Sequence, residues 1–212
     1  MRRTPERFFI RRGLIAGALA LAAAPARAAK RPVVTILGDS ITAGLGLAAA
    51  DALPNQLQAA LAKIGVPALV RGAGVSGDTT AAGLARLDFS VQGDTDLCLV
   101  ALGGNDLLQG LDPKETRANL TAIVQRLKQR RIAVVLAGIG APTQVGAGYA
   151  RDFDAVFDAV ARTQQVTLYP DLIAGVGPAL RQSDGIHPNA AGVKLIAGRL
   201  APVVARALRS RR

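Results

Sequence analysis

The 212 residues are enough for one domain with a packed core, and half of them are hydrophobic although only 3% are aromatic. The single cysteine, Cys98, excludes an intramolecular disulfide and is expected to be a buried free thiol, because it lies in the apolar run 97–102. The net charge of +11 does not indicate nucleic-acid binding. Residues 1–28 contribute +5 of it, and the other basic residues are scattered, without interleaved aromatics or a binding motif.

Residues 1–28 have the features of an export signal. An arginine-rich front precedes the apolar stretch 14–24, which is too short to span a bilayer as a stable helix. Ala-Arg-Ala at 26–28 predicts cleavage after Ala28, leaving a domain of residues 29–212. Arg11 and Arg12 resemble the pair of a twin-arginine signal; the general export pathway and an uncleaved amphipathic anchor are the alternatives. No cysteine follows the apolar stretch, which excludes a lipoprotein anchor.

Strand-like and helix-like segments alternate along the rest of the chain. Strands are predicted at 33–37, 68–70, 97–102, 132–137 and 166–169, and helices at 54–64, 83–91, 113–131, 149–163 and 190–208, with a glycine-rich turn at 72–80. Parallel strands need crossover connections, so this alternation indicates a parallel sheet covered by helices on both faces. The predicted fold is a flavodoxin-like three-layer α/β/α sandwich with a five-stranded parallel sheet.

Ser40 stands where the first strand stops, directly after Gly38 and Asp39. A strand-to-helix turn there places its side chain at the carboxyl edge of the sheet, where open α/β sheets bind ligands. It also places the Ser40 N–H at a helix N-terminus, which can hold an oxyanion. The alternative is that Ser40 only caps the following helix.

His187 is the only histidine of the chain, and a serine nucleophile at neutral pH needs a base of this kind. Asp184 lies three residues earlier, where its carboxylate can hold the other ring nitrogen and fix the tautomer. No lysine lies on the loops at this edge to serve instead. A surface or capping histidine ahead of the last helix is the alternative.

Acyl transfer also needs hydrogen-bond donors for the developing oxyanion. The backbone N–H groups of Ser40 and Gly77 and the side-chain amide of Asn105 are the candidates, because all three residues follow predicted strands. A plain turn at Gly77 and an Asx-type turn at Asn105 are the alternatives.

Four short blocks of this sequence carry a family resemblance. They are Gly-Asp-Ser-Ile at 38–41, Gly-Val-Ser-Gly-Asp-Thr at 74–79, Gly-Gly-Asn-Asp at 103–106 and Asp-Gly-Ile-His-Pro at 184–188. In order and spacing they resemble the SGNH hydrolases, or GDSL lipases, and most of all the small bacterial arylesterases, thioesterases and lysophospholipases. Isoleucine follows the serine where the family has leucine. The resemblance implies the same nucleophile, triad partners and oxyanion donors, and neither a metal nor an organic cofactor.

The sequence therefore predicts an exported serine hydrolase that forms an acyl-enzyme on Ser40 from a small-molecule ester or acyl substrate, with neither a nucleic-acid partner nor a stable membrane anchor. It leaves the oligomeric state open. An acetyl esterase or acyltransferase acting on carbohydrate or cell wall, and a non-catalytic periplasmic binding protein, are the rival interpretations. Candidate residues for an acyl pocket, which ordinary loop packing could also explain, are Leu107, Leu108, Leu111, Ile139 and Pro142.

Overall fold

The computed structural model describes Met1 and residues 30–210. The chain divides into two units, residues 1–30 and residues 31–212. The predicted signal and its cleavage after Ala28 lie outside the described residues. The second unit contains every helix and strand that the structure describes.

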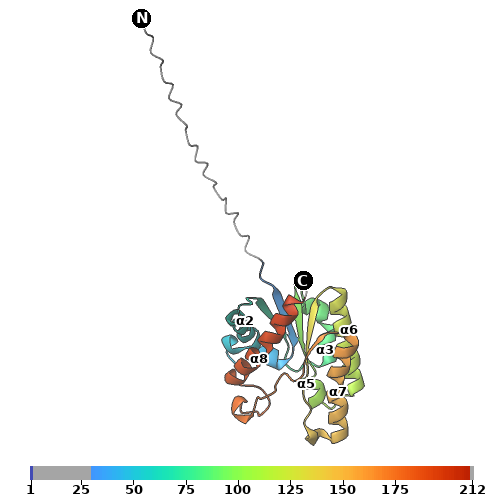
Figure 1. The fold of residues 1–212 in the computed structure, drawn as a ribbon. Coiled ribbons are helices and arrows are strands. Elements are labelled where there is room, and N and C mark those ends of the chain that lie inside the picture. Colours follow the sequence, from blue (N-terminus) through green and yellow to red (C-terminus); the bar gives the residue numbers. More distant parts are fainter. Residues whose placement is uncertain (2–29, 211–212) are drawn as a thin grey trace. The chain divides into compact units, whose positions relative to one another are not determined.

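Five parallel strands form the middle layer, in the order β2-β1-β3-β4-β5 (Figure 1). Their bounds are β1 Val33–Gly38, β2 Leu69–Gly74, β3 Leu97–Ala101, β4 Ala133–Ala137 and β5 Thr167–Tyr169. The order reverses between β1 and β3, and ligands bind at such a switch point in open α/β sheets. The predicted flavodoxin-like sandwich is confirmed.

Helices cover both faces of the sheet. On one side α2 (Leu53–Lys63) packs against α8 (Ala190–Arg209), and on the other α6 (Pro113–Gln129) packs against α3 (Thr80–Ala85) and α7 (Ala147–Gln164) (Figure 1). The short elements are α1 Ser40–Ala43, α4 Leu87–Ser90, α5 Gly104–Leu108, η1 Ala49–Asp51, η2 Thr143–Val145 and η3 Pro178–Leu180. No helix within residues 30–210 combines the length and the apolar character needed to cross a membrane.

The sequence pattern accounts for the layers. All six residues of β1 and all five of β3 are buried, because these two central strands have neighbours on both sides and helices on both faces. The Thr35 hydroxyl inside β1 is satisfied by the Thr95 hydroxyl at 2.8 Å. Cys98 is free and buried, as predicted, and burial raises the pKa of its thiol to about 12.

The predicted end of the second strand is wrong. The glycine-rich turn was expected to start at residue 72, but β2 runs on to Gly74 and pairs with β1 up to Gly38. Glycine is required at these positions of the strand, because neighbouring groups occupy the space that a side chain would need. A Cβ at Gly72 would lie 2.7 Å from the Pro54 ring, and one at Gly74 would lie 2.7 Å from the Asp39 carbonyl oxygen.

The helix predicted at 83–91 is two short helices. It begins earlier, at Thr80, where the Thr79 hydroxyl accepts the Ala82 N–H as an N-cap, and it breaks at Arg86. Leu87 and Val91 are fully buried, so the apolar side predicted for this segment still faces the core.

Candidate active site

Ser40 is the first residue of α1, directly beyond the carboxyl end of β1. Asp39 is the N-cap of this helix, and its carboxylate accepts the Ile41 N–H at 3.0 Å. Ser40 is therefore not the cap, and its side chain is available for another role. That side chain lines a cavity although the residue is only 8% exposed.

A hydrogen-bonded chain joins Ser40 to the loop before α8. The Ser40 Oγ lies 2.8 Å from His187 Nε2, and His187 Nδ1 lies 2.6 Å from Asp184 Oδ2. The other Asp184 oxygen accepts the backbone N–H groups of Ile186 and His187 at 2.9 and 3.0 Å. The hydrogen bond from the His187 ring, followed by these two N–H groups, lowers the pKa of Asp184 to about 2.

This arrangement selects one tautomer of His187. An ionised carboxylate only accepts hydrogen bonds, so Nδ1 carries the proton that Asp184 accepts. Nε2 then has its lone pair directed at the Ser40 hydroxyl, which donates to it. That is the protonation state in which an imidazole can take a proton from serine.

The loop carrying Asp184 and His187 is fastened to the loop carrying Ser40 by Gln182. Its side-chain amide donates to the carbonyls of Leu45, just beyond α1, and Pro188, at 2.8 and 3.0 Å. Its backbone N–H donates to the His187 carbonyl at 2.8 Å. Sequence reasoning missed Gln182, because its partners depend on a contact across 137 residues of chain.

The two remaining predicted donors lie on neighbouring loops. Gly77 is in the turn after β2 with φ +87°, a backbone conformation that favours glycine. Asn105 is in α5, after β3, and its amide donates to the Asp78 carbonyl at 2.9 Å. Asn105 lines the cavity of Ser40, whereas Gly77 is not among its lining residues and is linked to Asn105 through the adjoining Asp78.

Arg86 fixes the position of the turn that carries Gly77. Its guanidinium pairs with the Asp78 carboxylate at 2.5 Å and donates to the Gly38 carbonyl at 2.8 Å and to the Ser90 hydroxyl at 2.9 Å. The turn is thereby attached to the end of β1, two residues before Ser40. The sequence placed Arg86 inside a helix and gave no signal for this role.

Asp106 holds the helix that carries Asn105 in place, a third role that the sequence did not reveal. It is 1% exposed and accepts the Thr80 N–H at 2.8 Å and the hydroxyls of Thr80 and Thr116 at 2.5 and 3.1 Å. These bonds join the start of α5, next to Asn105, to α3 and α6. The sequence signal that could have found Asp106 was its position directly after the predicted donor Asn105.

A cavity of about 420 Å³ opens beside Ser40. Four of the five residues predicted for an acyl pocket line it, namely Leu107, Leu108, Ile139 and Pro142. Leu111 does not, and its carbonyl accepts the Tyr149 hydroxyl at 2.9 Å. Lining residues that were not predicted are Asp39, Ile41, Gly104, Gly140, Val145, Ile173, Arg181 and Ile186. Among the residues that the structure describes, no three His, Cys, Asp or Glu side chains are grouped to hold a metal ion.

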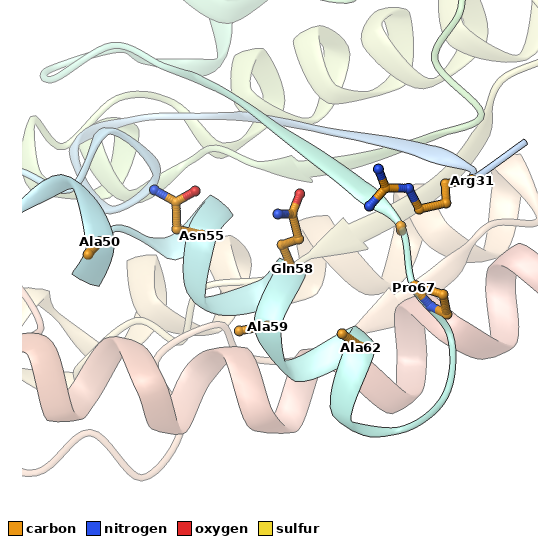
Figure 2. Close-up of a pocket in the computed structure, with 8 residues that line it drawn as sticks. Arg31, Ala50, Asn55, Gln58, Ala59, Ala62 and Pro67 are labelled. Atoms are coloured by element: carbon orange, nitrogen blue, oxygen red, sulfur yellow. The ribbon is translucent and has the colours of Figure 1, made fainter.

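A separate hollow of about 590 Å³ lies along α2 (Figure 2). The amides of Asn55 and Gln58 on its wall are already bound, to the Ala49 carbonyl at 2.7 Å and the Val70 N–H at 3.0 Å. It shares no lining residue with the cavity of Ser40 and is not part of the site.

A doubly wound parallel sheet with a serine–histidine–aspartate chain at its carboxyl edge defines the class of α/β serine hydrolases. The model of the GDSL-like Lipase/Acylhydrolase family matches residues 36–195. The chain belongs to this family, whose members are also called SGNH hydrolases, and it is an esterase that acts on small-molecule esters.

Named relatives agree. The chain is 38% identical to Esterase TesA of Pseudomonas aeruginosa over 178 aligned residues, which are 82% of this chain and 88% of that protein. It is 37% identical over 166 residues to Thioesterase 1/protease 1/lysophospholipase L1 of Escherichia coli K12, covering 77% and 78%. The crystal structure of AlinE4, an SGNH-hydrolase family esterase, is 41% identical with a TM-score of 0.71 over 84% of this chain and 97% of that one.

Proposed function

We propose that Ser40 is the nucleophile of this esterase, His187 its general base and Asp184 the group that orients the base. The observation that carries the proposal is the unbroken chain Ser40 Oγ–His187 Nε2–Asp184, with separations of 2.8 and 2.6 Å. Distances in this range allow proton transfer without rearrangement of the three side chains.

The reaction follows from these contacts. Ser40 Oγ attacks the ester carbonyl carbon while its proton passes to His187 Nε2. The C–O bond to the alcohol then breaks, and the alcohol leaves with the proton from His187, so that an acyl-Ser40 ester remains. A water molecule gives a proton to His187 and attacks this ester. The acid is released, and the same proton returns to Ser40.

The oxyanion of both tetrahedral intermediates is stabilised by the N–H groups of Ser40 and Gly77 and by the amide of Asn105. The hydrogen bond to the Asp78 carbonyl uses one of the two hydrogens on Asn105 Nδ2 and holds the plane of the amide. The second hydrogen is left for the oxyanion. Donors fixed before the reaction avoid the cost of reorganising during it.

The substrates we propose are carboxylic esters with short or medium acyl chains, together with thioesters and lysophospholipids. The cavity supports this class, because its wall beside Ser40 is formed largely by Leu107, Leu108, Ile139, Val145 and Ile173. The names of the relatives, which include an esterase, an arylesterase and a thioesterase/lysophospholipase, point to the same range.

A fluorophosphonate probe tests the nucleophile. It should label the wild-type protein at Ser40 and fail to label Ser40→Ala. The control is Ser76→Ala, which removes an exposed serine in the turn next to Gly77 and should leave labelling intact. Labelling of a different serine in the wild type, or esterase activity retained by Ser40→Ala, would refute the assignment.

We further propose that residues 1–28 direct export and are removed, so that the enzyme works in the periplasm or outside the cell. The support is the sequence of that segment. Mass spectrometry of the protein from a producing cell should give an N-terminus at Ala29 or within two residues of it. Replacing Arg11 and Arg12 by lysine should stop export by the twin-arginine route and leave the general route unaffected. Soluble exported protein that retains Met1 would refute cleavage.

A further inference from the structure

The exposed apolar side chains of this protein are concentrated around the active site. Among residues 30–210, eight large hydrophobic side chains are exposed. Five of them lie on loops or on the short helices α5 and η2, beyond the carboxyl ends of the strands, and are between 43% and 64% exposed. We call these five the apolar rim: Leu45, Val75, Leu108, Val145 and Ile186.

Each member of the rim lies close to the catalytic serine. Leu108, Val145 and Ile186 line the cavity of Ser40, and Leu45 lines a small crevice that also contains Ser40 and His187. Val75 donates its backbone N–H to the Gly38 carbonyl at 3.1 Å, two residues before Ser40. Three of the five rim residues therefore line the cavity through which a substrate reaches the nucleophile, and the other two lie on segments that adjoin Ser40.

The loops that carry the rim hold few free charges. Residues 44–50, 72–77 and 138–148 contain no Asp, Glu, Lys or Arg. On the adjoining segments Asp78 is paired with Arg86, Asp106 is buried and Asp184 is bound to His187. The one arginine that lines the cavity, Arg181, donates to the carbonyls of Val176 and Gly185 at 3.1 and 2.8 Å. Residues 29–212 carry a net charge of +6, but these basic residues are not clustered at the rim. An apolar rim with a single arginine, whose guanidinium is bound to backbone carbonyls, suits a neutral surface better than a surface of acidic headgroups.

We propose that the apolar rim docks the enzyme onto the surface of a neutral lipid assembly, from which ester molecules pass directly into the cavity. This inference rests on the proposed function, because the surface it binds is an assembly of its substrates or of lipids that contain them. Each rim side chain that enters the apolar layer is removed from water, and the binding free energy grows with the apolar area buried in this way. A second protein is a poorer occupant, because stable protein interfaces bury about 800 Å² on each partner, more than five half-exposed aliphatic side chains provide.

The test measures sedimentation with phosphatidylcholine vesicles, using the full mature chain with Ser40→Ala so that nothing is hydrolysed. The rim variant is Leu45→Ser together with Val75→Ser, because neither side chain lines the proposed acyl cavity. The control variant is Ile64→Ser with Phe89→Ser. These residues are 44% and 90% exposed and lie outside the rim, so the control removes more exposed apolar surface than the rim variant.

The parent protein should sediment with the vesicles. The rim variant should partition on the order of tenfold less, and the control variant should bind like the parent. In the background with Ser40 restored, the rim variant should lose a larger fraction of its rate on an emulsified ester than of its rate on the same ester class in solution, whereas the control variant should lose equal fractions. A wild type that fails to hydrolyse the dissolved ester would count against the proposed function. A wild type that hydrolyses it, together with a parent protein that does not bind vesicles, would count against docking alone.

Four results would overturn docking. They are the absence of vesicle binding by the parent, equal loss in the control variant, a salt-sensitive preference for phosphatidylglycerol vesicles, and a dimer in sedimentation velocity that the rim variant dissociates. The last result would show that a second copy of the chain occupies the rim.

Discussion

Replacing Asp39 by asparagine should stabilise the protein at pH 8 and leave its stability unchanged at pH 4. Asp39 is only 5% exposed, and burial raises the pKa of its carboxyl from 3.8 to about 6. One oxygen accepts the Ile41 N–H, a role that an asparagine amide oxygen fills equally well at an N-cap. The other faces Gly104 and the cavity, where an amide NH2 can meet water.

The raised pKa gives both the sign and the size of the effect. Between pH 4 and pH 6 the folded state holds the Asp39 proton while the unfolded chain has lost it, so stability falls as the pH rises through this window. A shift of about two pKa units corresponds to about 3 kcal/mol. For a domain of this size that is roughly 6–12 °C in Tm. The asparagine side chain of the variant carries no charge at any pH, so the variant avoids this loss.

Urea unfolding of the wild type and of Asp39→Asn at pH 4, 6 and 8 measures the difference. The gain in unfolding free energy should be near zero at pH 4 and reach its full value by pH 8. Asp88→Asn is the control, because the Asp88 side chain is 71% exposed and its removal should change stability by well under 1 kcal/mol at every pH. An Asp39→Asn protein that is no more stable than the wild type at pH 8 would refute the reasoning.

Three further predictions concern the reaction. Asn105→Ala should lower kcat on the order of 10²-fold or more in steady-state assays with little change in unfolding, and a near-normal kcat would make Asn105 only a turn residue. Arg86→Met should also lower kcat, and by a smaller factor when Asn105→Ala is already present, because part of its effect passes through the Asn105 amide and the rest through the Gly77 turn. Arg71→Met breaks an equally short ion pair outside the cavity and should leave kcat unchanged in either background. Asp184→Asn should slow turnover less than His187→Ala, since Asp184 orients the base and stabilises its charge, and the opposite order would contradict the roles proposed here.

The parts of the fold that were predictable are those governed by local pattern. Continuous aliphatic runs marked the buried strands, and apolar spacing marked α2, α6, α7 and α8 to within about two residues. Asn189, a residue type favoured at N-caps, caps the last helix, and its side chain accepts the Gly192 N–H at 3.0 Å. The alternation of strands and helices then left few arrangements of the sheet to choose from.

The site was predictable where chemistry restricted the choice. A single histidine left one candidate base, and an aspartate three residues before it left one candidate partner. The contacts that hold these groups in place were not predictable, because they join residues far apart in the chain. Arg86 and the Gly38 carbonyl are 48 positions apart, and Gln182 and the Leu45 carbonyl are 137 apart. The extent of β2 was missed for the same reason: the Pro54 ring, from another part of the chain, occupies the space that a side chain at residue 72 would need.

These long-range contacts explain how short loops can hold a precise site without disulfides. The Gly38 carbonyl at the end of β1 accepts two hydrogen bonds, from the Val75 N–H at 3.1 Å and from Arg86 at 2.8 Å. Both fasten the turn that carries Gly77, and through the Asp78 carbonyl they also set the plane of the Asn105 amide. Because Ser40 is only two residues beyond Gly38, the nucleophile and the donors share one reference point at the end of β1, a fully buried strand. A displacement of β1 moves them together, which preserves the distances that catalysis requires.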